Sequence, residues 1–179
     1  MNPSRIPESS RIVFACTLCA VFFAAVLASA QSRETVELYR IERSLNANVV
    51  HYDANLTPEG NLHPSKPVVG YWILHEKGGK RQKLTQIDKA MAHGFKVERD
   101  PGAEFVTMRP SPNPEREIKV YRVNDGWRAE TLINGQPAFL ERVYVKTRGS
   151  GLNIKVEYVE VFGHEIGSGD DLYEKLTPQ

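Results

Sequence analysis

The sequence predicts a mainly β domain, either an antiparallel barrel or a strongly curved sheet or sandwich, with one short covering helix. Three observations support this fold class. After Val36, apolar and polar residues alternate with a period of two along most of the chain, which is typical of half-buried strands. Two Gly-containing pairs, at 125–126 and 134–135, separate neighbouring runs and favour tight hairpin turns. Only residues 83–94 show helical spacing instead.

The first 30 residues have the layout of a secretory signal peptide. Arg5 and Arg11 flank the start of an apolar run over residues 12–28, and small residues occupy 28–30, where a signal peptidase needs them. We therefore expect export, to the periplasm or outside the cell, with cleavage after Ala30. The run is long enough to remain as an uncleaved anchor, and only then do we expect contact with a membrane.

Residues 31–179 are expected to form a single β-rich domain with one core. Both cysteines, Cys16 and Cys19, lie in the leader, so the domain has no thiol for a disulfide. Acidic and basic side chains are equal in number after residue 30, and nothing in this balance indicates a nucleic-acid partner.

The first half of the domain contains five strand-like runs, at residues 36–43, 49–54, 68–75, 95–99 and 104–109. The first two form a hairpin with residues 44–47 as its connection, because Ser and Asn side chains satisfy turn backbone groups locally. Residues 68–75 are apolar on both faces, so this strand is expected to be central and covered twice.

Residues 83–94 predict the one helix. Leu84, Ile87, Ala90 and Met91 recur at helical spacing, and Gly94 follows where a left-handed C-terminal cap belongs. So short a helix is marginal alone, which favours a position across an open end or face of the sheet. The lysines and arginine that precede it predict a solvated loop, with an anion site as the alternative.

Four further strands, at residues 118–123, 127–133, 136–146 and 154–162, form a meander. Taking both Gly-containing pairs as two-residue turns places Val120 opposite Thr131, and Thr131 opposite Ala138. Pro137 then opposes Leu132 in a pair that needs no amide hydrogen. The resulting core face consists of Ile118, Val120, Ala129, Ile133, Ala138 and Leu140.

The same register turns Arg122 and Arg142 toward the core, near Trp127. A buried guanidinium is costly without a partner, so each needs a carboxylate, water or an anionic ligand. In the first hairpin, Glu42 and Arg43 point to opposite faces because they are adjacent in a strand. One of them must face inward or line an opening.

The run LYRIERSLNANVVHYDAN at residues 38–55, PVVGYWI at 67–73, AHGF at 92–95 and the late VYVKT and VEYVEVFG segments resemble domain-of-unknown-function family 4833. The resemblance covers residues 38–163, and IERSLNANVV is its most specific part. It implies the extent of the domain but no activity, cofactor or catalytic residue.

Other chemical candidates are few. His51 and Asp53 share a strand face, but no third metal ligand is evident, and the glycine-rich segment at 162–171 lacks the spacing of a calcium loop. We therefore predict no metal and no cofactor. Nucleophile elbow, zincin and P-loop motifs do not occur in the sequence.

These observations favour a non-catalytic exported protein that binds a small anionic or amphipathic molecule. Inward-facing cations beside an aromatic ring in a β domain support such a site, for which the candidate residues are Arg122, Arg142, Trp127, Glu42, Arg43 and Asn48. One alternative is an interaction module that recruits an envelope protein through a sheet edge. Another is a hydrolase built from dispersed acidic residues and His51.

Overall fold

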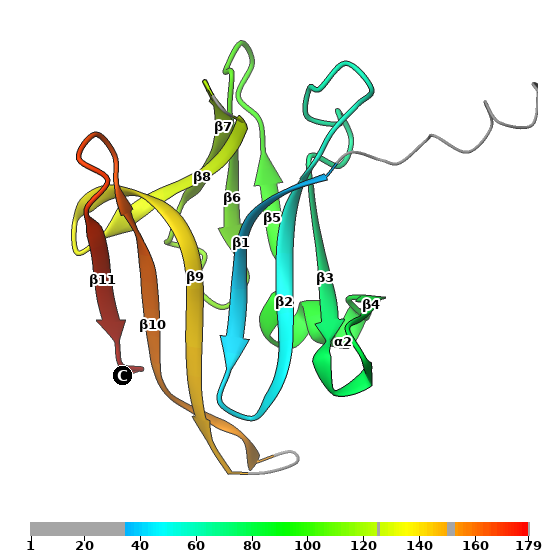
Figure 1. Ribbon diagram of the computed structural model, residues 1–179, viewed down its shortest axis with the longest axis vertical. Coiled ribbons are helices and arrows are strands. Elements are labelled where there is room, and N and C mark those ends of the chain that lie inside the picture. Colours follow the sequence, from blue (N-terminus) through cyan, green and yellow to red (C-terminus); the bar gives the residue numbers. More distant parts are fainter. Residues whose placement is uncertain (1–34, 125, 150–152, 179) are drawn as a thin grey trace, which may run out of the picture. The chain divides into compact units, whose positions relative to one another are not determined.

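The computed structural model describes residues 35–124, 126–149 and 153–178 of the chain (Figure 1). The predicted signal peptide, residues 1–30, lies outside these ranges, so both cleavage and anchoring stay predictions. Among the described residues, no helix is long and apolar enough to cross a membrane.

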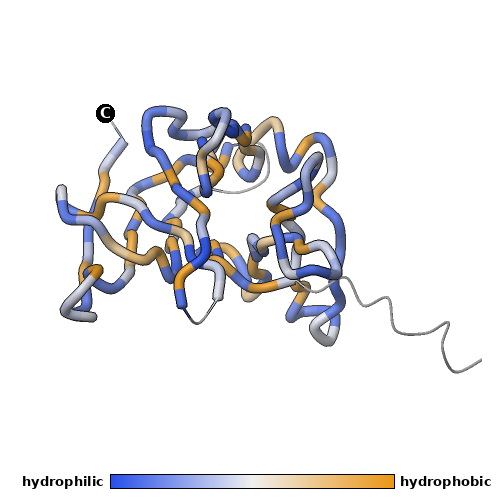
Figure 2. Tube along the Cα trace, turned by 90° about the horizontal axis from the view of Figure 1, so that it is seen from above, coloured by the Kyte–Doolittle hydropathy of each residue, from blue (hydrophilic) through white to orange (hydrophobic). Residues whose placement is uncertain are grey.

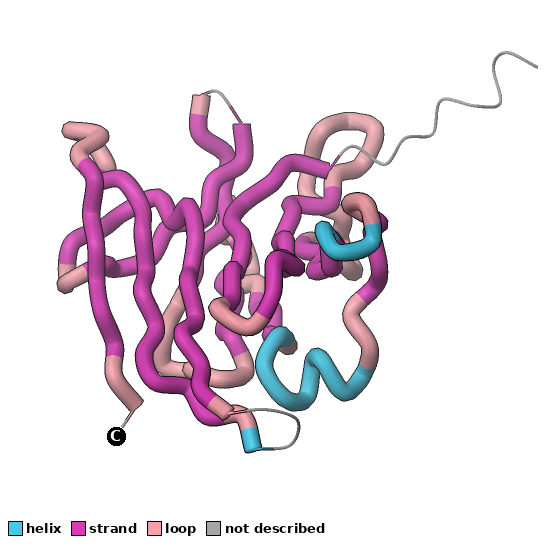
Figure 3. The backbone as a smooth tube through the Cα atoms, turned by 60° about the horizontal axis from the view of Figure 1, so that its bottom comes forward, coloured by secondary structure: helices cyan, strands magenta, loops and turns pink. Residues whose placement is uncertain are grey.

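Strands dominate the domain, as the sequence predicts. The first six are β1 (Thr35–Arg43), β2 (Asn46–Asn55), β3 (Val68–Leu74), β4 (Lys80–Lys83), β5 (Phe95–Glu98) and β6 (Val106–Pro110). The other five are β7 (Ile118–Val123), β8 (Gly126–Ile133), β9 (Gln136–Arg148), β10 (Lys155–Glu165) and β11 (Asp171–Leu176). The helical parts, cyan in Figure 3, include η1 (His75–Lys77) and the consecutive α2 (Gln86–Asp88) and η2 (Lys89–His93).

The strands form one sheet that curls into an open half-barrel. Nine of them follow the order β4-β3-β2-β1-β9-β8-β7-β6-β5, and β10 and β11 extend from β9. β9 has three neighbours, because β8 pairs with its first part, β1 with its second part, and β10 with most of its length. The β1–β9 pair is parallel, whereas the sequence predicts antiparallel pairing. Figure 1 shows β5 and β6 behind β1 and β2.

The core lies on the concave face of the sheet. Orange and blue alternate along the strands in Figure 2, as expected when one face is buried. Tyr52 of β2 joins the two walls, since its ring stacks on Tyr39 with centroids 4.7 Å apart and meets the edge of Phe95 at 5.6 Å. Fully buried side chains come from both walls: Val50, Val68, Val106, Met108, Val120 and Ile133.

β3 differs from its predicted place in the sheet. It lies between β2 and the short edge strand β4. Trp72 and Leu74 are buried on its inner face, but Tyr71 and Ile73 on the other face are half-exposed. The prediction that both faces are covered is wrong, because a guanidinium and not a second layer lies over the outer side: Arg81 Cζ is 3.5 Å from the centroid of the Tyr71 ring.

The turn between β8 and β9 confirms the predicted register there. Asn134 and Gly135 both have positive φ, 50° and 78°, as a two-residue turn of this kind requires. Thr131 pairs with Ala138 and Pro137 pairs with Leu132. This part of the meander therefore follows directly from its turn residues.

The turn between β7 and β8 lies one residue earlier than predicted. Val123 pairs with Gly126, so Val120 opposes Ala129 and not Thr131. Gly126 instead begins β8 with a φ of 146°. A register change of two residues leaves every side chain on its original face, and all six predicted core residues are buried: Ile118, Val120, Ala129, Ile133, Ala138 and Leu140.

A β-bulge in β9 reverses the alternation halfway along the strand. Phe162 pairs with Arg142 but Gly163 pairs with Leu140, which leaves Glu141 as the extra residue. Leu140 before the bulge and Val143 after it both contact the core, so Arg142 points to the outer face. The prediction that Arg142 faces the core is wrong because one inserted residue exchanges the two faces.

Gly163 allows the strands to approach at this bulge. A Cβ atom on this residue would stand 2.3 Å from the Phe139 carbonyl oxygen and 2.8 Å from Ile133 Cδ1. Backbone atoms cannot move away as a flexible side chain can. The position therefore accepts only glycine without a shift of β10 relative to β9.

The predicted helix is present but short. Thr85 and Asp88 form a capping box, in which the Thr85 side chain accepts from the Asp88 amide and the Asp88 carboxylate accepts from the Thr85 amide. The segment then widens into the π-helical turn η2. Leu84 is buried as expected, but Ile87 and Met91 are exposed, so only the start of the predicted apolar face packs.

Gly94 does not form the predicted left-handed cap. Its φ is −75° and its ψ is 160°, which is an extended conformation. Glycine is needed there for space, because a Cβ atom would stand 2.2 Å from the Lys89 carbonyl oxygen and 2.9 Å from Ser111 Oγ.

We expect Gly163→Ala to lower the free energy of unfolding by about 2–4 kcal/mol, since the new methyl group overlaps a backbone carbonyl. Urea unfolding followed by circular dichroism would measure this. Leu132→Ala, at an exposed residue of β8, is the matched control and should change stability by less than about 0.5 kcal/mol. A Gly163→Ala protein as stable as the control would contradict the close approach.

Candidate functional site: the outer face of the C-terminal strands

Beyond the bulge, the solvent-facing side of β9, β10 and β11 is rich in aromatic rings and cations. Val143 and Val161 face the core, so their neighbours along each strand face outward. Register places Phe162 beside Arg142 and Tyr173, and Tyr158 beside Lys146. We call this surface the outer aromatic face; it consists of Arg142, Tyr144, Lys146, Tyr158, Phe162, Tyr173 and Lys175.

Rings and cations contact each other directly on the outer aromatic face. Arg142 Cζ lies 3.6 Å from the centroid of the Phe162 ring, and Lys175 Nζ lies 3.7 Å from that of Tyr158. The Phe162 and Tyr173 rings have centroids 5.3 Å apart. The Tyr173 hydroxyl donates to Glu160 Oε1 at 2.9 Å, and this hydrogen bond raises the pKa of Tyr173.

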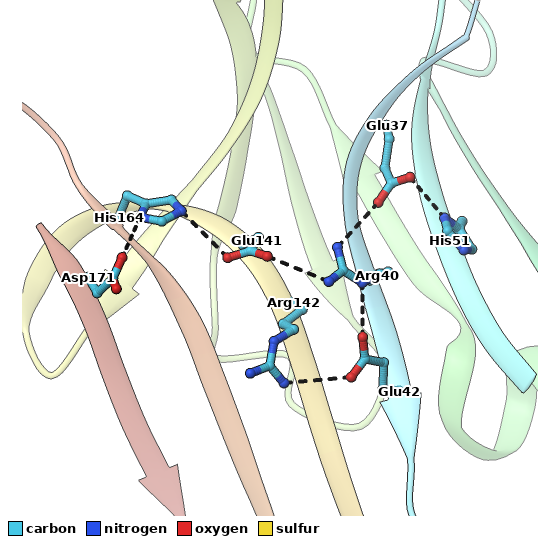
Figure 4. A network of polar contacts seen from close by, with 8 residues as sticks. All are labelled: Glu37, Arg40, Glu42, His51, Glu141, Arg142, His164 and Asp171. Atoms are coloured by element: carbon cyan, nitrogen blue, oxygen red, sulfur yellow. Dashed lines mark hydrogen bonds and ion pairs between the residues drawn. The ribbon is translucent and has the colours of Figure 1, made fainter. Parts of the chain in front are cut away.

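An ion-pair network continues from Arg142 across β1 and β2, as Figure 4 shows. Arg142 Nη1 is 3.6 Å from Glu42 Oε2, and Glu42 Oε1 accepts from Arg40 Nε at 2.9 Å. Arg40 is the centre of the network, because its other nitrogens lie 3.5 Å from Glu141 and 3.9 Å from Glu37. The hydrogen bond that Arg40 donates to Glu42, together with the nearby carboxylates, raises the pKa of Arg40.

Two histidines end this network, each beside a carboxylate. His51 Nδ1 is 3.0 Å from Glu37 Oε2, and His164 Nδ1 is 3.0 Å from Asp171 Oδ1. The hydrolase alternative requires such a histidine–carboxylate contact within a cleft, but both pairs lie on the open face of the sheet. The residues that the structure describes contain no group of three or more His, Cys, Asp or Glu side chains placed to hold a metal ion.

Asp53 shares the outer face of β2 with His51, as predicted, but faces other partners. The carboxylate is buried, and its Oδ2 accepts from the Tyr71 hydroxyl at 2.9 Å. Arg81 Nη2 lies 3.9 Å from the same oxygen. Burial and the hydrogen bond to Asp53 raise the pKa of Tyr71. These contacts stabilise the β2–β3–β4 edge. His51 contacts the same cluster through its ring, which stacks on Tyr71 with centroids 5.6 Å apart.

Arg122 and Trp127 lie at the end of β7 and the start of β8. They form a cross-strand pair, but Arg122 is exposed, and its guanidinium makes no hydrogen bond or ion pair with another described residue. Trp127 is buried, and its indole nitrogen donates to the Gly60 carbonyl at 3.2 Å. The predicted common pocket of Arg122, Arg142 and Trp127 is therefore not formed.

Arg43 lies at the end of β1 on the inner face, opposite to Glu42 as predicted. Its Cζ is 4.4 Å from the centroid of the Trp72 ring, and His93 meets the edge of the same ring at 4.9 Å. Arg43 Nε and His93 Nδ1 are both buried, and neither has a hydrogen-bond partner among the described residues. Burial lowers the pKa of Arg43, although the carboxylates of Asp88 and Glu76 oppose this shift.

Asn48 holds the first hairpin against η1. Its Nδ2 donates to Glu76 Oε2 at 3.0 Å, and its Oδ1 accepts from the Glu76 amide at 3.3 Å. Asn46 Oδ1 accepts from Arg43 Nη2 at 3.4 Å and from the Asn48 amide at 3.1 Å. These contacts explain the polar residues in the middle of the first hairpin, whose connection is two residues shorter than predicted because β2 begins at Asn46.

A cleft of about 540 Å³ lies on the outside of β7 and β8. Its walls carry charges of both signs, several of which are already paired: Arg116 Nη2 is 2.5 Å from Glu174 Oε2, and Glu130 accepts from the Tyr121 hydroxyl at 2.6 Å. Most small-molecule pockets have mainly apolar walls. None of the predicted site residues lines this cleft.

Comparison of the chain with protein families identifies one match, described as "Domain of unknown function (DUF4833)", over residues 39–175. The chain belongs to this family. The match confirms the resemblance of residues 38–163 and extends it to β11. No curated protein and no solved structure matches the chain.

The six predicted site residues of this DUF4833 domain thus fall into three places. Glu42 and Arg142 meet in the ion-pair network, Arg43 and Asn48 lie at the end of the first hairpin, and the remaining two flank the β7–β8 turn. The aromatic residues of the outer aromatic face were not predicted from the sequence as part of a site. A signal was present in VEYVEVFG, where Tyr158 and Phe162 fall on the side of the strand opposite to Val159 and Val161.

We expect Arg40→Gln to destabilise the DUF4833 domain by about 1 kcal/mol, because three carboxylates then repel one another with only Arg142 and two histidines nearby. About 1 M NaCl should reduce this loss by screening the repulsion. Urea unfolding at two salt concentrations is the measurement, with Arg122→Gln as a control cation outside the network. A loss that is equal at both salt concentrations would contradict an electrostatic origin.

His93 predicts a pH dependence of stability. Burial, with a smaller effect of the Arg43 charge, lowers its pKa to about 4, whereas an unfolded histidine titrates near 6.5. Between these values only the unfolded chain binds the proton, so the free energy of unfolding falls by about 2 kcal/mol from pH 7 to pH 5. His93→Gln should abolish that slope, whatever its effect on stability at pH 7.

His164→Gln is the control for this measurement, since His164 lies on the open outer face. Urea unfolding across this pH range should show the wild-type slope in the control. An unchanged slope in His93→Gln would exclude His93 as its source.

Proposed function

We propose that this DUF4833 domain is a non-catalytic binding protein for a small amphipathic anion, which lies on the outer aromatic face. The observation that carries the proposal is the position of Arg142, whose guanidinium covers the Phe162 ring at 3.6 Å on the solvent side of the sheet. The leader pattern in residues 1–30 supports an exported protein, periplasmic or secreted.

The charges of the outer aromatic face suit an anion. Arg142 and Lys146 point outward from β9, and Lys175 points outward from β11 on the other side of β10. Glu160 of β10 lies between them, with one oxygen engaged by the Tyr173 hydroxyl. An arginine fork can hold a phosphate or carboxylate with two hydrogen bonds. The cost is partial loss of the Arg142–Glu42 contact, which is weak because both side chains are solvent-accessible.

The rings suit the apolar part of the same ligand. Solvent-facing sides of antiparallel sheets normally carry polar residues, yet Tyr144, Tyr158, Phe162 and Tyr173 gather here. Covering such rings removes apolar surface from water. Because the surface is open, the expected affinity is modest, with a Kd on the order of 0.1–1 mM.

Strand addition to β11 is the second candidate, since β11 pairs with β10 on one side only among the described strands. Asn134 Nδ2, however, donates to the Tyr173 carbonyl at 2.6 Å. Asn134 thus already occupies one of the two acceptor positions of this carbonyl and stands where an added strand would pair. This contact favours the ligand-binding proposal over an envelope protein partner at this edge.

Octyl phosphate and octyl glucoside, which share one alkyl chain but differ in charge, test the proposal. Calorimetric titration below their micelle concentrations should show binding of octyl phosphate by the wild type, weakened about tenfold in Arg142→Gln. Arg122→Gln, at an exposed cation far from the site, should bind as the wild type does. Equal affinity for the two amphiphiles, or an unaffected Arg142→Gln protein, would refute the proposal.

A further inference from the structure

The helical segment between β4 and β5 presents two large apolar side chains to solvent. Ile87 is 73% exposed and Met91 is 77% exposed. They are four residues apart in α2 and η2, so they lie on one side of the segment. Single exposed apolar residues are ordinary on a protein surface, but an adjacent pair on a protruding helical turn indicates an interaction site.

The segment cannot turn this pair inward, because both of its ends are fixed. Leu84 is buried at the start, where its Cδ1 lies against Gly70. At the end His93 is only 5% exposed, and its carbonyl accepts from the Tyr52 hydroxyl at 3.0 Å. The capping box of Thr85 fixes the first turn between these anchors. The exposure of Ile87 and Met91 is thus a property of the folded state.

Cations surround the exposed pair in the chain. Lys77 ends η1, Lys80 and Lys83 belong to β4, and Lys89 stands between the two apolar residues; all four are exposed and make no ion pair within the described ranges. Figure 3 shows the cyan turns of η1 and of α2 and η2 on either side of β4.

The acidic residues of this region are engaged elsewhere. Glu76 binds Asn48, and Asp88 Oδ2 accepts from the Thr85 amide at 2.8 Å and its hydroxyl at 2.7 Å. Partial burial alone would raise the pKa of Asp88. The hydrogen bonds from Thr85 and from the Trp72 indole outweigh this effect, so the pKa of Asp88 is lowered. Neither carboxylate forms an ion pair with a lysine among the described residues, and the four lysines outnumber the two carboxylates.

We infer that this segment docks the domain on an anionic lipid surface, with Ile87 and Met91 inserted between headgroups and the four lysines above them. Two apolar side chains and a cluster of lysines are the two contributions to interfacial binding, apolar burial and attraction to anionic lipid. A protein groove would suit the apolar pair but not four unpaired cations. A symmetric contact with a second copy of the chain would bring the lysines of both copies together, and their charges would repel one another. This inference is independent of the outer aromatic face.

Sedimentation with vesicles tests the inference. The protein of residues 31–179 should sediment with vesicles of phosphatidylglycerol and phosphatidylcholine in equal parts, and not with phosphatidylcholine alone. Ile87→Ser with Met91→Ser should lower the partition coefficient about tenfold, and Lys83→Gln with Lys89→Gln by a similar factor. Leu132→Ser, at a 57% exposed residue of β8, is the matched apolar control and should bind as the wild type does.

Three results would overturn the inference: binding to both vesicle types alike, a Leu132→Ser protein as impaired as the double serine variant, or no binding to either vesicle. Light scattering of the same variants tests whether a second copy of the chain, and not a lipid surface, covers the apolar pair. A wild-type dimer that the double serine variant converts to a monomer would assign the apolar pair to a contact between two copies, and the lipid surface would be rejected. Circular dichroism should show that every variant stays folded.

Discussion

The fold depends on β9, the strand that pairs with three other strands along its length. Its first part completes the wall made with β8, and its second part joins β1 in a parallel pair, while β10 follows both parts. A straight strand with strict alternation could not keep its apolar side chains inside through this change of partner. The bulge at Glu141 resolves the conflict, because it turns Val143 inward after Leu140, and Gly163 gives the bulge the space it needs.

This constraint explains how far the sequence could predict the fold. Alternation and the Asn134-Gly135 turn indicated the core face correctly, and an error in the other turn did no harm because it shifted the register by an even number of residues. A bulge shifts the alternation by one, and no turn pair marks it in the chain. The sequence alone therefore could not predict that Arg142 faces outward, whereas it could predict that Ile118 faces the core.

The candidate site was less predictable than the fold because polar partners come from distant parts of the chain. The opposite orientation of Glu42 and Arg43 followed from adjacency in a strand, but the Trp72 ring under Arg43 and the Arg142 partner of Glu42 depend on how separate strands meet. The helical spacing that includes Ile87 was predicted correctly. The segment is fixed by the buried residues Leu84 and His93, however, so the Ile87 side chain faces water. Sequence periodicity predicts which residues share one face of an element, but contacts with other elements determine whether that face is buried.

The interior leaves little room for chemistry, and this is why both proposed surfaces are external. Tyr39, Tyr52 and Phe95 fill the centre, where Tyr52 stacks on Tyr39 and meets Phe95 edge-on. The buried His93 closes the end near the helical segment. A ligand in the interior would have to displace these packed rings, at a cost comparable to much of the stability of a domain. On the outer aromatic face the rings and cations already stand in solvent, so binding there requires no opening of the fold. The proposed anion site therefore belongs to the sheet surface, which the bulge in β9 shapes by turning Arg142 outward.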